Sequence, residues 1–199
     1  SKPPEIFDFD PTPLLFHARD KGYELIEDCP EIRRKGWARL VLFASFLRPY
    51  LLDIPSFYKV LKNAFRPGFR NRKLHYGLYP FEWKNGWEES SKELLGDKQP
   101  LLQVAPVLER LVFPRSKEVF LKWLDQISSF KGIKWLVSAH YSAPIKFNNK
   151  IIKEFKKDIQ RRDWAISENN WKFLDNLDKF LLKTGVVPSD PLQKFKDLD

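Results

Sequence analysis

The side chain best placed for chemistry in this sequence is His140, which follows a short apolar run and precedes a proline-containing loop. Residues 133–137 predict a buried strand, and His140 comes just after its end, where ligands tend to bind in open α/β sheets. Ser138 and Ser142 flank it, but the G-x-S-x-G motif of a nucleophilic serine does not occur in the sequence. The pattern therefore does not predict a serine hydrolase.

The sequence holds few other candidate metal ligands: His17, His75 and the single cysteine, Cys29. Zinc needs three or four ligands, and these residues lie at no diagnostic spacing from His140. Cys29 lies in an acidic context that disfavours a reactive thiolate. The sequence also contains neither a P-loop nor a G-x-G-x-x-G motif. We therefore expect no cofactor and no metal, and His140 and His17 are the candidate ligands if a metal does bind.

The formal net charge of +9 is concentrated in two segments. Residues 61–84 carry six basic side chains against Glu82 alone, and residues 146–162 carry seven against Glu154 and Asp158, so each segment has a net charge of +5. Two basic patches on a nearly neutral body indicate an acidic partner, which could be a protein face, anionic lipid headgroups or nucleic acid. A solvated surface that only keeps the protein soluble is the alternative.

The first basic segment interleaves its charges with aromatic residues, a composition typical of interface hot spots. It also resembles a single-strand stacking surface, although no nucleic-acid-binding module accompanies it. We predict that these two segments supply the partner-binding side chains: Arg66, Phe69, Arg70, Arg72, Lys73, Tyr76 and Tyr79 from the first, and Lys153, Lys156, Lys157 and Arg161 from the second.

The elements that would position these residues are mostly helices. Helical periodicity predicts helices over 35–47, 116–130 and 168–183, with shorter helices after Ser56, over 87–95 and over 151–159. Strands are expected at 14–17, 23–27 and 133–138. We predict an extended arm over 1–13, a single helix-dominated α/β domain over 14–188 and a flexible tail over 189–199. No apolar run approaches 18 residues, so no transmembrane helix is expected.

Six blocks of the sequence resemble an uncharacterised family of cyanobacterial and plastid proteins, annotated only as a domain of unknown function. The blocks are LLFHARD (14–20), RRKGWARLVLF (33–43), FRPG (65–68), YPFEW (79–83), VAPVL (104–108) and SAHYSAPI (138–145). The resemblance spans residues 14–188 and implies a distant relationship to metallo-β-lactamase-fold proteins. The expected fold is then half of a metallo-β-lactamase-like sandwich, with few strands.

The resemblance also implies a degenerate site. The H-x-H-x-D-H cluster of active relatives would lie in an upstream half that this chain does not contain, and the string does not occur here. The bridging aspartate would fall near residues 14–19, where the chain has His17-Ala18-Arg19. His140 would take the place of the last metal-binding histidine.

These observations favour a non-catalytic accessory protein or subunit that docks onto a larger assembly through its basic and aromatic surfaces. The family resemblance implies a photosynthetic assembly, a photosystem or another thylakoid complex, on the stromal side of plastid thylakoids or in the cyanobacterial cytoplasm. Peripheral contact with an anionic membrane surface is consistent with the same patches. The alternatives are part of a metal-dependent hydrolase, and a single-stranded nucleic-acid binder.

Overall fold

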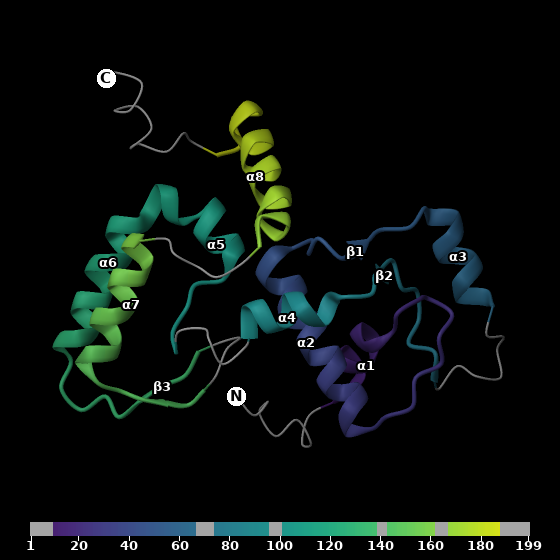
Figure 1. The fold of residues 1–199 in the computed structure, drawn as a ribbon, viewed down its shortest axis with the longest axis horizontal. Helices are drawn as coiled ribbons and strands as arrows, with labels where there is room; N and C mark the ends of the chain where they lie inside the picture. The colour runs from purple at the N-terminus through teal and green to yellow at the C-terminus, as the bar shows by residue number, and fades with distance from the viewer. Residues whose placement is uncertain (1–9, 67–73, 96–100, 139–142, 162–166, 188–199) are drawn as a thin grey trace. The chain divides into compact units, whose positions relative to one another are not determined.

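The structure, a computed structural model, describes residues 10–66, 74–95, 101–138, 143–161 and 167–187. These residues form eight helices and four strands of two residues each (Figure 1). The expectation of a helix-dominated α/β chain is therefore confirmed. Chain contacts divide the molecule into an N-terminal unit, Lys2–Phe43 with Arg48–Lys92, and a C-terminal unit, Ala44–Leu47 with Glu93–Asp199. The sequence predicts a single domain over residues 14–188.

The N-terminal unit contains α1 (Thr12–Ala18), most of α2 (Pro30–Phe46), β1 (Leu52–Asp53), α3 (Phe57–Phe65), β2 (Glu82–Trp83) and the start of α4 (Trp87–Leu95). β1 and β2 pair antiparallel, with Leu52 opposite Trp83. α1 lies close against α2 at Gly36, where a Cβ atom would lie 1.8 Å from the carbonyl oxygen of Leu14. Only glycine permits that approach between the two backbones.

The C-terminal unit contains α5 (Pro106–Leu111), α6 (Phe113–Ser129), β3 (Trp135–Leu136), β4 (Ile145–Lys146), α7 (Asn149–Arg161) and α8 (Glu168–Lys183). α7 buries Ile152, Phe155 and Ile159, which recur at helical spacing, and α6 packs against it. The rings of Phe120 and Phe155 meet edge to face, with centroids 6.1 Å apart. Leu174 of α8 is fully buried in the same unit.

The predicted helices over 35–47, 116–130 and 168–183 are confirmed as α2, α6 and α8, and the shorter ones as α3, α4 and α7. The strand predicted at 14–17 is wrong, because these residues belong to α1. Leu14, Leu15 and Ala18 are its buried side chains, at a spacing that one helix face accommodates. No strand is assigned at 23–27, all of which the structure describes.

The strand predicted at 133–138 forms only as β3, and it is not buried. Trp135 and Val137 are exposed, and β3 pairs antiparallel with β4, so the segment is a short hairpin and not the central strand of an open sheet. His140 lies outside the described residues, as do the first nine residues of the predicted arm and the predicted tail over 189–199. In the described part of the chain, no helix has the length and apolarity needed to cross a bilayer.

Candidate functional site

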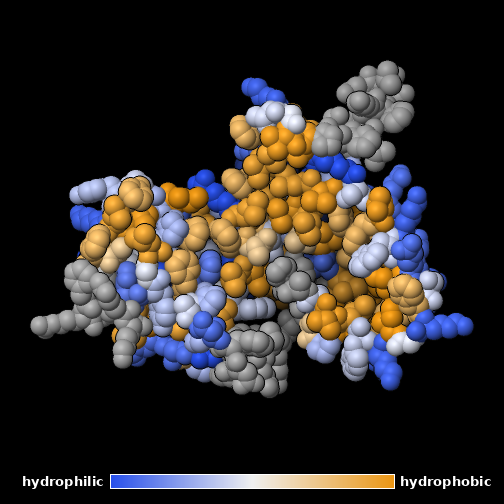
Figure 2. Space-filling model, turned by 180° about the vertical axis from the view of Figure 1, so that it is seen from behind, coloured by the Kyte–Doolittle hydropathy of each residue, from blue (hydrophilic) through white to orange (hydrophobic). Residues whose placement is uncertain are grey.

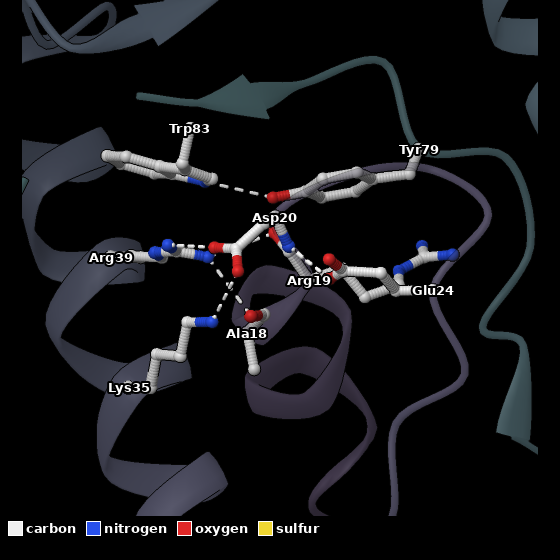
Figure 3. Close-up of polar contacts among 8 residues, drawn as sticks. All are labelled: Ala18, Arg19, Asp20, Glu24, Lys35, Arg39, Tyr79 and Trp83. Atoms are coloured by element: carbon white, nitrogen blue, oxygen red, sulfur yellow. Dashed lines mark hydrogen bonds and ion pairs between the residues drawn. The ribbon is translucent and has the colours of Figure 1, made fainter. Parts of the chain in front are cut away.

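Two buried arginines organise the N-terminal unit around the end of α1 (Figure 3). Arg39 reaches across from α2, and its Nη1 donates to the carbonyl oxygens of Ala18 and Arg19, both at 3.0 Å. Its Nη2 forms an ion pair with Asp20. The guanidinium also lies over the rings of Trp83 and Trp87, 5.0 and 4.5 Å from their centroids. Arg39 therefore joins α2 to the C-terminal end of α1.

Asp20 carries the negative charge of this cluster. Its second carboxylate oxygen accepts a hydrogen bond from Lys35 Nζ at 2.9 Å. Burial raises the pKa of Asp20, but the hydrogen bonds from Lys35 and Arg39 outweigh that effect and hold the pKa below its usual value. Asp20 is therefore ionised at neutral pH and compensates the charge of buried Arg39.

Arg19 fixes the other side of the cluster. Its Nη1 donates to the carbonyl oxygen of Gly77 at 3.1 Å, and its Nη2 lies 3.5 Å from that of Tyr76. The guanidinium lies over the rings of Phe16 and Tyr79, 5.0 and 4.6 Å from their centroids. Burial lowers the pKa of Arg19 to about 10, so the side chain stays cationic at neutral pH. Arg19 thus holds residues 76–77, which lie within the first basic segment.

Tyr79, predicted as a partner-binding residue, is instead a core residue. Its hydroxyl oxygen accepts a hydrogen bond from Trp83 Nε1 at 2.9 Å. Burial raises the pKa of Tyr79 to about 12, so the hydroxyl stays protonated. The prediction was wrong because the ring covers the Arg19 guanidinium, a contact between distant parts of the sequence.

His17 is placed among aromatic rings and cations, which does not favour metal binding. Its ring packs on Phe16, Phe43 and Phe81, with centroids 5.3, 5.9 and 6.1 Å away. Burial, followed by the charges of Arg19 and Arg39, lowers the pKa of His17 to about 4. The same two charges would oppose a bound cation. In the described ranges, no three His, Cys, Asp or Glu side chains are grouped as metal ligands.

The internal cluster supports α3 through the segment 20–26. Asn63 of α3 is buried against Gly22, where an added Cβ would lie 3.2 Å from the Asn63 Cβ. Arg66, which follows α3, lies over the ring of Tyr23 at 4.1 Å. His75 Nε2 lies 2.8 Å from the carbonyl oxygen of Gly22, which ties the same segment to residues 74–79. These contacts fix the side of α3 that carries Asn63.

The opposite side of α3 is open to solvent. Phe57, Tyr58 and Phe65 are 74%, 77% and 69% exposed. Leu61 is half-buried, and the basic residues Lys62 and Arg66 are exposed beside these rings. We call these six residues the α3 surface. Of the apolar residues Phe57, Val60 and Leu61, only Val60 is buried.

Sequence reasoning missed the exposed rings of the α3 surface, although one signal was present. Nine residues hold four large apolar side chains besides Val60, which is more than one side of a short helix can bury. Arg66 is the one predicted contact residue that belongs to this surface. Tyr76 is half-buried, and burial raises its pKa. The remaining predictions in this segment, Phe69, Arg70, Arg72 and Lys73, fall outside the described residues.

The second predicted basic surface lies on α7. Lys153 and Lys157 are exposed, whereas Lys156 is half-buried and pairs with Asp125 of α6. The side chain of Arg161 is outside the described part of the structure. This face is basic, but it lacks the exposed aromatic rings that accompany the charges on α3.

The comparisons with known proteins give a family. A family model described as a domain of unknown function, DUF4336, matches residues 1–158. The chain belongs to this family. The DUF4336 match contains the α3 surface, the buried arginines and most of α7, while α8 follows it. No significant match was found among curated proteins or among solved structures.

Proposed function

We propose that this DUF4336 protein is a non-catalytic accessory protein or subunit that docks onto a larger, membrane-associated assembly through the α3 surface. The observation that carries the proposal is the presence of three largely exposed aromatic rings next to two basic side chains on one short helix. Exposed aromatic residues accompanied by arginine are typical of protein contact sites. We propose further that this assembly is photosynthetic, and this part of the proposal rests on the family resemblance alone.

The arrangement of the N-terminal unit supports a role in binding. Its buried charged groups, Arg19, Arg39 and Asp20, bond to backbone carbonyls and to one another. Such a cluster fixes local geometry, and the segment that it leads into, residues 20–26, is the one against which Asn63 of α3 packs. We infer that the cluster keeps the α3 surface presented in one orientation, which lowers the entropic cost of docking.

The test is co-migration with native complexes after mild detergent solubilisation of source membranes. The double variant Tyr58→Ser/Phe65→Ser removes two exposed rings and should shift the protein from the complex-bound to the free fraction. The matched control is Phe180→Ser, an aromatic residue of α8 that is 60% exposed. The control should leave co-migration unchanged. Equal co-migration of the wild type and the double variant would overturn the proposal.

A further inference from the structure

Helix α3 has three sectors, which follow from the helical repeat of about 3.6 residues per turn. Val60 and Asn63 form the buried sector. Phe57, Tyr58, Leu61 and Phe65 form an apolar sector that is largely open to solvent. Lys59, Lys62 and Arg66 form a basic sector beside it. Figure 2 shows exposed hydrophobic residues beside hydrophilic ones in the part of the N-terminal unit that carries α3.

A comparison with α7 shows that this exposure is particular to α3. Both helices are amphipathic, and α3 carries two lysines and α7 four. The apolar side of α7 is covered, because Ile152, Phe155 and Ile159 are buried. The described residues of the N-terminal unit leave the apolar side of α3 exposed, and α3 lies apart from α1 and α2 (Figure 1). The rings of α3 therefore remain accessible in the N-terminal unit.

The chemistry of the two open sectors is complementary to an anionic lipid surface. Helices that lie in a membrane interface insert aromatic and aliphatic residues at the level of the acyl-chain boundary and keep lysine and arginine at the headgroups. Lys59 pairs with Glu82 at 2.7 Å, so Lys62 and Arg66 are the cations beside the exposed rings. A single convex helix can meet a fluid lipid surface without the shaped pocket that a folded protein partner would need.

We infer that α3 docks this protein onto an anionic lipid bilayer, with Phe57, Tyr58 and Phe65 inserted at the interface and Lys62 and Arg66 contacting lipid phosphates. The inference deepens the proposed function and rests on it, because it names the surface that the same site contacts. An acidic protein face is the competing occupant.

Flotation with protein-free vesicles tests the inference. Vesicles of mixed phosphatidylcholine and phosphatidylglycerol should bind the full-length protein, and vesicles of phosphatidylcholine alone should bind it much less. Tyr58→Ser/Phe65→Ser should lower the partition coefficient by about tenfold or more, from the apolar area no longer inserted. Lys62→Gln should lower it about fivefold, and added salt should weaken binding of the wild type. Phe180→Ser and Lys179→Gln, both on α8, are the matched controls and should change nothing.

The outcomes separate this inference from the proposed function. If the wild type does not bind anionic vesicles, but the α3 double variant is lost from native complexes, the lipid assignment is wrong and a protein face is the occupant. Binding to vesicles that survives in the double variant would overturn the assignment to α3. Equal binding to both vesicle types would overturn the role of the cations. If the double variant changes neither vesicle binding nor co-migration, both proposals fail.

Discussion

Replacing Arg39 by methionine tests the central claim about the N-terminal unit. Methionine keeps an unbranched side chain at this position but has no guanidinium. The carbonyl oxygens of Ala18 and Arg19 therefore lose their donor. A buried acceptor left without a partner costs about 1–3 kcal/mol. The stacking on Trp83 and Trp87 is also lost, at about 0.5–2 kcal/mol for a desolvated cation.

These terms are not additive, since they share one side chain. Breaking a buried ion pair from one side costs about 3–5 kcal/mol, and we expect the total for Arg39→Met in this range. Asp20 is half-exposed and keeps Lys35, which limits the cost of its lost partner. A loss of this size is a large fraction of the about 5–15 kcal/mol by which domains are stable.

The assay is urea unfolding followed by tryptophan fluorescence, which reports on this cluster because Trp83 and Trp87 lie against Arg39. The matched control is Arg34→Met, at an exposed position of the same helix, and it should change the free energy of unfolding by no more than about 0.5 kcal/mol. Equal losses in Arg39→Met and Arg34→Met would refute the claim that Arg39 holds α1 against α2.

Three further predictions concern packing and pH. Gly36→Ala should destabilise the protein by about 3 kcal/mol, because the new methyl group meets the Leu14 carbonyl and must push α1 away. Leu174→Ala should cost about 2–5 kcal/mol in thermal or urea unfolding, since the side chain is fully buried. His17 has a pKa of about 4 when folded, against an ordinary value of 6.5, so the unfolded chain binds more protons between these pH values. The contribution of His17 to the free energy of unfolding should be fully present above pH 6.5 and lost as pH falls toward 4. His17→Phe should weaken this dependence of stability on pH.

Each of these three predictions has a matched control or an outcome that would contradict it. Ala38→Gly, a change on the same helix, gives the intrinsic backbone effect against which Gly36→Ala is judged. Lys172→Ala, an exposed neighbour of Leu174, should be close to neutral. If His17→Phe follows the same pH dependence as the wild type, the pH effect does not come from His17.

The long helices were predictable because their apolar residues recur over several turns. In α6 and α8 the buried Leu124 and Leu174 lie on such repeats, and the pattern holds over four turns. α1 was not predictable in the same way. Its seven residues contain the run Leu14–Leu15, which fits a strand or a helix equally well, and only Arg39, about twenty residues later, decides in favour of the helix.

The candidate site was predictable in its location but not in its detail. The concentration of arginine, lysine and aromatic residues near Arg66 pointed to the part of the chain that contains the proposed α3 surface. Which rings face outward depends on Gly22 and Asn63, whose contact involves two segments distant in sequence. Periodicity alone could not show that α3 packs through Val60 and Asn63 and leaves Phe57 and Phe65 in solvent.

The dependence of α1 on Arg39 has a consequence for the order of folding. A helix of seven residues is too short to persist alone in water. The free-energy cost of nucleating it exceeds the gain from the hydrogen bonds of one or two turns. Residues 12–18 leave the ribosome before residue 39, so they must wait in a disordered state until α2 has formed and its guanidinium reaches the carbonyls at the end of α1. We therefore expect the first helix in the chain to form after the second.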